Sequence, residues 1–271
     1  MGVRFEAVTH DINVAASMRL AEIARARGIK RFVFASSCSV YGFASDGART
    51  ESDATDPLTA YAKSKVAMEK ALAPIAGPEM QVTCLRFATA CGFSPRLRLD
   101  LVLNDFVASA LATGAVTVLS DGSPWRPLIH VADMARAIEW ALQRESAAGG
   151  DMLIVNAGSD QWNYQVRDLA LAVNDAIPGT KVSINTDAQP DRRSYRVNFE
   201  LFRSLAPGHQ PRVTLRSAID GLATGLRDIG FGDTDFRNSD LIRLRALGRL
   251  IDAGTLSNDL AWQSATAHIN R

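Results

Sequence analysis

The feature that most constrains the fold is an alternation of short β-prone runs with amphipathic segments of ten or more residues. It begins with a helical pattern at residues 11–27, which Gly28 can end, and a β-prone run at 31–36. It continues with helices predicted at 58–76, 101–112, 131–144 and 166–177, and strands at 80–87, 116–119, 152–155 and 181–184. Such an alternation builds βαβ units, so we predict an α/β fold with a doubly wound parallel sheet.

The pattern changes near residue 187. Three prolines divide short segments there, and helical patterns follow at 214–228 and 240–253. We therefore predict an α/β domain over 1–186 and a smaller, mainly helical lobe with a weakly held tail over 187–271. At the helix starts, Thr9 or Asp11 is expected to cap the first helix, and Asp56-Pro57 to open the second.

Composition argues against several classes of partner. Thirty basic and 29 acidic residues leave a formal charge of +1, so bulk electrostatics gives no reason to expect nucleic acid or an anionic membrane. The N-terminus lacks the apolar core of a signal peptide, and no stretch has the roughly 20 uncharged residues of a membrane helix. Cys38, Cys84 and Cys91 match neither a disulfide framework nor a zinc site. We expect a soluble, cytoplasmic protein without a bound metal.

The helix predicted at 58–76 carries the first candidate chemistry. Tyr61 and Lys65 are one helical turn apart, so they project from one face. An ammonium group beside a phenol stabilises the phenolate and lowers the tyrosine pKa from about 10 toward the working pH. The hydroxyl can then exchange a proton with a substrate alcohol. The spacing alone is also that of an ordinary exposed helix pair.

A serine cluster follows the first predicted strand, since residues 36–42 read Ser-Ser-Cys-Ser-Val-Tyr-Gly. Open α/β sheets bind ligands at the carboxyl ends of their strands. A serine there can donate a hydrogen bond to the oxygen that Tyr61 protonates, and Gly42 permits the backbone to turn away. Together, the strand, the serine cluster, Val-Tyr-Gly, a polar loop and the Tyr-x-x-x-Lys helix form a far more specific pattern than either motif alone.

This order of motifs resembles the extended short-chain dehydrogenases/reductases of the NAD-dependent epimerase/dehydratase family, from residue 11 or earlier to about residue 230. The resemblance implies a Rossmann-like sheet, with 1–186 as catalytic domain and 187–271 as substrate-binding lobe. In that family a Ser or Thr, a Tyr and a Lys form the catalytic triad. The matching positions here are Ser37, Tyr61 and Lys65.

The resemblance also implies ligands and an assembly. NAD or NADP is expected as cofactor, with contacts from Tyr61, Lys65 and Ser36, and a nucleotide-diphosphate sugar as substrate. The family further suggests a homodimer formed through the helices near 11–27 and 58–76.

One departure from the family bears on the reaction. The 4,6-dehydratases carry Thr-Asp-Glu where this chain has Ser37, Cys38 and Ser39, so the acidic pair for elimination is absent. This difference favours an epimerase or a reductase over a dehydratase. Some related epimerase-reductases use a cysteine acid two residues before the tyrosine. Cys38 lies three residues before Tyr41, so we favour a small packed residue there over a catalytic thiol.

Further positions are matched to substrate contacts. Residues 125–133 resemble the family segment that closes over the nucleotide diphosphate, and Arg126 offers the planar pair of donors suited to it. Arg192 matches a second arginine of the C-terminal lobe, with Arg193 nearly as suitable. Thr89 takes the place of an asparagine that often touches the sugar. His130 and Asp133 are expected to cap the following helix and hold its packing.

No Gly-x-x-Gly-x-x-Gly loop follows a strand anywhere in the sequence. In the family this loop and the first strands precede the part that the chain resembles, so we expect an N-terminally truncated form whose NAD affinity is weakened or lost. The strand at 31–36 should then have an unpaired edge.

Three functions remain at this stage. The first is an NAD(P)-dependent NDP-hexose 4-epimerase that acts through a 4-keto intermediate. The second is a catalytically inert fragment or nucleotide-sugar-binding protein. The third is an NAD(P)H-dependent keto-sugar reductase with the same triad.

Overall fold

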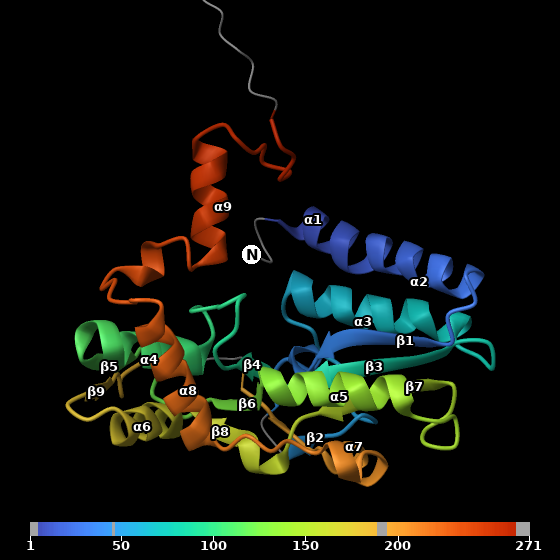
Figure 1. Ribbon diagram of the computed structural model, residues 1–271, viewed down its shortest axis with the longest axis horizontal. Coiled ribbons are helices and arrows are strands. Elements are labelled where there is room, and N and C mark those ends of the chain that lie inside the picture. Colours follow the sequence, from blue (N-terminus) through green and yellow to red (C-terminus); the bar gives the residue numbers. More distant parts are fainter. Residues whose placement is uncertain (1–4, 45–46, 189–193, 264–271) are drawn as a thin grey trace, which may run out of the picture.

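A parallel sheet of three strands forms one half of the molecule (Figure 1). The computed structural model describes residues 5–44, 47–188 and 194–263. The strands lie in the order β1-β3-β7, and their bounds are Arg31–Ser37, Gln81–Phe87 and Met152–Ala157. Ser37 pairs with Phe87, and Phe87 with Ala157, so the three carboxyl ends lie together.

Helices cover both faces of this sheet. Phe34 and Val82 pack against α3 (Ala60–Leu72), whereas Leu85 packs in the cluster that contains α5 (Val131–Gln143). The predicted α/β, Rossmann-like doubly wound arrangement is therefore confirmed. Among the described residues β1 pairs only with β3, as the prediction of an open edge required.

Two predicted helix starts are wrong. The first helix begins earlier, with α1 (Glu6–His10) running through a π-helical turn into α2 (Ser17–Ala26). Thr9 donates its hydroxyl to the Phe5 carbonyl inside this helix and caps nothing. Helix α3 is capped by Thr59 rather than by Asp56, because the Thr59 hydroxyl accepts a hydrogen bond from the Ala62 amide.

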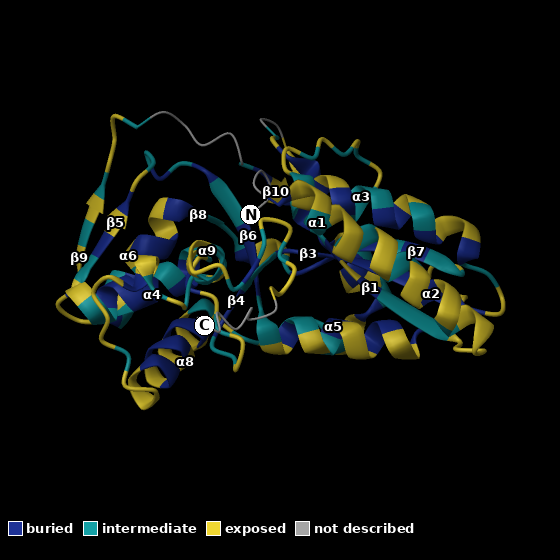
Figure 2. Cartoon of the chain, turned by 90° about the horizontal axis from the view of Figure 1, so that it is seen from above, coloured by how far each residue is buried: buried dark blue, intermediate teal, exposed yellow. Residues whose placement is uncertain are grey.

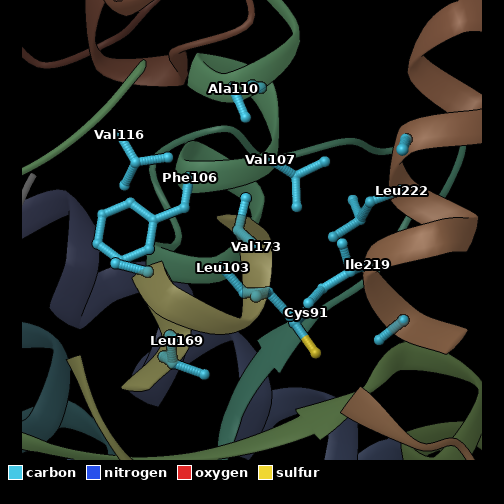
Figure 3. Close-up of a cluster of buried hydrophobic side chains, with 14 of the residues drawn as sticks. Cys91, Leu103, Phe106, Val107, Ala110, Val116, Leu169, Val173, Ile219 and Leu222 are labelled. Atoms are coloured by element: carbon cyan, nitrogen blue, oxygen red, sulfur yellow. The ribbon is translucent and has the colours of Figure 1, made fainter. Parts of the chain in front are cut away.

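The other half of the molecule surrounds an apolar core between three helices (Figure 3). These helices are α4 (Val102–Thr113), α6 (Val166–Ala176) and α8 (Leu215–Asp228). Leu103, Val107, Val173 and Leu222 are fully buried between them. The core thus joins residues from both sides of the boundary predicted at residue 186.

Several short strands escaped the sequence patterns. β4 (Thr89–Cys91), β6 (Trp125–His130) and β8 (Asn163–Gln165) form one small sheet. Two further pairs are parallel, and their bounds are Ala48–Arg49 (β2) with Arg196–Val197 (β10), and Ala115–Val118 (β5) with Lys181–Ile184 (β9). β5 and β9 confirm the strands predicted at 116–119 and 181–184. The other strands in this group that have two or three residues are too short to show a periodicity.

The remaining helices are α7 (Glu200–Leu205) and α9 (Arg243–Asp252). Helix α9 stands apart from the rest of the molecule in Figure 1, and none of its residues is buried. Figure 2 shows that exposed residues also gather on the outer sides of α1 and α2. Within the described residues, no helix is long and apolar enough to cross a membrane, and no three His, Cys, Asp or Glu side chains could together hold a metal ion.

Candidate active site

Ser37 and Tyr61 meet at the carboxyl end of β1. Ser37 ends this strand, and its hydroxyl accepts a hydrogen bond from the Ser39 amide at 3.2 Å. Tyr61 lies in the first turn of α3, and the Ser37 side chain is close enough to its hydroxyl to act on the pKa of Tyr61. The tyrosine is 44% exposed, so a ligand could reach it. Two of the three side chains predicted to form the triad are thus near each other.

Lys65 lies one turn further along α3. Its ammonium group donates a hydrogen bond to the Ala35 carbonyl at 2.7 Å and lies 5.3 Å from the centroid of the Tyr61 ring. Burial lowers the pKa of Lys65, and the Glu69 carboxylate acts in the opposite direction. The lysine therefore shares a site with Tyr61, as its spacing predicted.

The predicted lowering of the Tyr61 pKa is wrong for this ligand-free geometry. Although the residue is 44% exposed, partial desolvation of the phenol raises the pKa of Tyr61 above its ordinary value, whereas Ser37 and the charge of Arg98 act to lower it. The Lys65 ammonium is bonded to a backbone carbonyl rather than to the phenol oxygen. The pKa of Tyr61 is therefore raised, and Lys65 is not among the groups that act on it.

Ser36 points to the opposite side of β1, because successive side chains of a strand alternate between its faces. It is buried, and its hydroxyl donates a hydrogen bond to Glu69 Oε1 at 2.5 Å. This hydroxyl serves the interior of the protein, so its geometry gives no support to the predicted cofactor contact of Ser36.

A buried polar network joins α3 to the sheet. Arg86 donates from Nε and Nη2 to the two Glu69 oxygens at 3.0 and 2.8 Å, and from Nη1 to the Tyr41 hydroxyl at 3.0 Å. Tyr41 in turn donates to Asn156 at 2.7 Å. Sequence reasoning missed this network. Glu69 lies one further turn beyond Lys65, and that spacing was the available signal.

Gly42 turns the chain away from this network, as predicted. Its φ is +65°, and a Cβ at this position would lie 1.9 Å from the Asp56 carbonyl oxygen. A residue with a side chain could not occupy this turn without moving the loop that leads to α3.

A cavity of about 540 Å³ lies in the other half of the molecule. Thr89 and Arg126, two predicted substrate contacts, both line it, together with Asp100, Asp105 and Arg237. Arg126 donates from Nη1 to the Trp125 carbonyl at 2.8 Å. The third predicted contact, Arg192, and the neighbouring Arg193 lie outside the described residues.

An arginine missed by sequence reasoning connects the cavity with the Tyr61 site. Arg98 donates from Nε and Nη2 to the two oxygens of Asp100, at 3.0 and 2.7 Å. Asp100 lines the cavity, while the charge of Arg98 acts on Tyr61. Arg98 therefore interacts both with Tyr61 and with a residue of the cavity wall.

The two other polar residues of this region have structural contacts. The His130 side chain accepts a hydrogen bond from the Ala132 amide and caps α5, as predicted. Asp133 accepts hydrogen bonds from the Arg212 and Val213 amides at 2.9 and 3.1 Å, so it fixes the segment before α8 rather than its own helix.

The donor set at the end of β1 fits one end of a dinucleotide. A phenol and an ammonium group beside a strand terminus can bind ribose hydroxyls and place a nicotinamide. The 271 residues contain no glycine-rich loop for the pyrophosphate. Tyr61 and Lys65 therefore suit the nicotinamide and ribose end of such a cofactor, but not its pyrophosphate.

Curated proteins similar to this chain are nucleotide-sugar enzymes. An uncharacterized UDP-glucose epimerase, YtcB of Bacillus subtilis, is 31% identical over 139 residues, which are 51% of this chain and 43% of that protein. A dTDP-glucose 4,6-dehydratase of an Actinoplanes species is 27% identical over 76% of this chain and 63% of its own length. The chain thus spans less than two thirds of each of these relatives.

Solved structures show the same fold. The complex of MoeE5 with UDP-glucose and NAD has a TM-score of 0.68 and 29% identity, over 80% of this chain and 71% of that one. The UDP-glucose-4-epimerase from Stenotrophomonas maltophila, with a TM-score of 0.70, 23% identity and coverage of 81% and 70%, is similar in fold. The model of the NAD dependent epimerase/dehydratase family matches residues 3–158, more than half of the sequence. The chain therefore belongs to the NAD-dependent epimerase/dehydratase family.

Proposed function

We propose that the chain is the catalytic and substrate-binding part of an NAD(P)-dependent nucleotide-sugar 4-epimerase that acts through a 4-keto sugar. The observation that carries this proposal is the grouping of three side chains at the end of β1, where Ser37 acts on the Tyr61 hydroxyl and the Lys65 ammonium lies 5.3 Å from the Tyr61 ring. A cavity that Arg126 lines supports it. Similar proteins that are named UDP-glucose epimerases support the choice of substrate class.

The side chains divide the work between proton transfer and binding. Ser37 acts on the Tyr61 hydroxyl, so a sugar hydroxyl bound beside both could accept a hydrogen bond from Ser37 and exchange its proton with Tyr61. Arg98 favours the phenolate that removes this proton, and Lys65 adds a second cation 5.3 Å from the ring. A bound NAD(P) would supply the hydride acceptor.

The cavity residues position the substrate. The Arg126 guanidinium presents planar donors that suit a diphosphate, and the Thr89 hydroxyl can bind a sugar hydroxyl. In this scheme the protein holds the sugar carbon near Tyr61, and such positioning accelerates a reaction strongly.

A second candidate function is nucleotide-sugar binding without turnover. It is favoured by one observation: the residues that line the cavity are all in this chain, whereas a glycine-rich loop for the cofactor pyrophosphate is not. Tight NAD binding by these 271 residues would contradict this alternative.

The test combines turnover with calorimetry on the purified chain. UDP-glucose is incubated with and without NAD, and UDP-galactose is followed by NMR, while UDP and NAD are titrated separately. Conversion that depends on NAD supports the epimerase, and net consumption of NADPH with a 4-keto sugar indicates the reductase instead. UDP binding without NAD binding or turnover indicates the binding protein, and absence of both overturns the proposal.

A further inference from the structure

Arg237 enters the cavity from a part of the chain that sequence reasoning left without a role. It follows Phe236, which is fully buried in the core of α4, α6 and α8 and packs edge-on against Phe231, with ring centroids 5.7 Å apart. This anchor fixes the backbone beside the cavity, and Arg237 is one of the side chains that line it.

The guanidinium is held in place along one edge. Nε and Nη2 donate to the two Asp105 oxygens, each at 2.8 Å, and Nη2 also donates to the Ser109 hydroxyl at 2.6 Å. The group also lies 4.9 Å from the centroid of the Phe236 ring. These contacts orient a planar group whose position would otherwise vary with four rotatable bonds.

The other edge of the guanidinium remains available. Arginine has five N–H donors, and the two on Nη1 contact no acceptor among the residues that the structure describes. The Arg237 side chain is 52% exposed, and Arg126 lines the same cavity. Two guanidinium groups in one cavity suit a ligand with several anionic oxygens.

We infer that Arg237 is a binding residue for the diphosphate of the substrate, which it contacts through Nη1 while Asp105 and Ser109 hold its opposite edge. The inference rests on the proposed function, because it assigns a second cation to the same nucleotide-sugar site. The two residues of the ion pair have different roles in this inference. Arg237 contacts the ligand, whereas Asp105 orients Arg237 and partly cancels its charge.

The test is calorimetric titration of the 271-residue chain with UDP and with UMP. Arg237→Gln should weaken UDP binding by about tenfold or more, because a charge-assisted hydrogen bond to a buried or half-buried anion is lost. The same substitution should also reduce the ratio of the UDP affinity to the UMP affinity, because UMP lacks the second phosphate. Asp105→Asn should weaken UDP binding clearly less than Arg237→Gln does, since the guanidinium and its charge remain although its orientation is less fixed. Arg216→Gln is the matched control, because Arg216 makes a similar pair with Asp220 away from the cavity.

Several outcomes overturn the inference. UDP binding by Arg237→Gln at the wild-type affinity does so, and so does an equal loss in Arg237→Gln and Asp105→Asn, which would make the pair a structural clamp. Weaker binding of UDP-glucuronic acid alone would assign Arg237 to a sugar carboxylate instead. Should Arg237→Gln fail to fold, Arg237→Lys takes its place and is expected to bind UDP more weakly. A wild-type chain that binds no UDP contradicts the proposed function itself.

Discussion

Beside the β1-β3-β7 sheet one ion pair is sealed from solvent, whereas beside the α4, α6 and α8 core a similar pair lines a cavity. Glu69 and Arg86 are 3% and 6% exposed, but Asp105 and Arg237 are 21% and 52% exposed. Both pairs consist of a guanidinium that donates from Nε and Nη2 to two carboxylate oxygens. The same kind of ion pair thus differs between the two halves in how far it is exposed to solvent.

The buried pair fixes one part of the protein relative to another. Glu69 lies on the helix that carries Tyr61, and Arg86 lies on the strand beside Ser37, so their hydrogen bonds set the position of α3 against the sheet. The half-exposed pair keeps donors for a ligand. The comparison suggests that one half of the molecule holds the reacting groups, and the other half recognises the substrate.

The largest effect is expected from Tyr61→Phe, which removes from the first half the hydroxyl that we propose transfers the proton. We expect turnover of UDP-glucose to fall by at least about 100-fold, the usual share of general acid–base catalysis, while UDP affinity stays unchanged. The measurement pairs the NMR assay with calorimetry. An active Tyr61→Phe variant, or one that loses UDP binding, would remove the proposed division of work.

The next prediction compares how much the two ion pairs contribute to the free energy of unfolding. Glu69→Gln leaves the Arg86 charge buried without its carboxylate, so we expect the free energy of unfolding to fall by about 3–5 kcal/mol. Asp105→Asn is the matched change in the half-exposed pair and should cost about 1 kcal/mol or less. Urea unfolding followed by circular dichroism measures both. Equal losses of unfolding free energy in the two variants would show that burial does not decide how much each ion pair contributes to stability.

Removing a large side chain from the core of the second half should lower both the stability of the protein and its affinity for UDP. Leu222 is fully buried between α8 and α4, so Leu222→Ala is expected to lower the free energy of unfolding by about 2–5 kcal/mol. Because Arg237 depends on this core through Phe236, UDP affinity should fall more than turnover at saturating substrate. Unchanged UDP affinity in a destabilised variant would separate the core from recognition.

The sequence predicted most of the fold because its long elements carry clear periodicity. The helix at 131–144 and the strand at 31–36 were found within one residue of their observed bounds. The first helix started early because residues 6–10 continue the same helix without a cap. The strands of two or three residues were missed because they pair across long stretches of sequence.

The candidate site could be predicted only in part. Ser37 and Tyr61 follow a strand and begin a helix, so local pattern was enough to bring them together. Arg237 and Asp105 are 132 residues apart, and nothing local to either marks the contact. The protonation of Tyr61 also depends on burial and on the Arg98 guanidinium, which spacing along a helix does not reveal.

A smaller effect should appear at alkaline pH. Burial raises the pKa of the Cys91 thiol from 9.0 to about 12, and it raises the pKa of Cys38 and Cys84 as well. The unfolded chain ionises these thiols first, so their contribution to stability is complete below about pH 9 and falls as the pH rises toward 12. Unfolding free energies measured across this range should decline, and Cys91→Ala should make the decline shallower. A flat curve in the wild-type protein would contradict the burial of these thiols.

The most direct test of the Tyr61–Ser37 contact is an NMR titration of ring-labelled tyrosine. The chain has only four tyrosines, so Tyr61→Phe identifies the signal. We expect Tyr61 to titrate above the ordinary value of 10.0, and to titrate higher still in Ser37→Ala, because Ser37 acts to lower its pKa. A Tyr61 signal that titrates identically in the wild-type and Ser37→Ala proteins would contradict the contact on which the proposed chemistry depends.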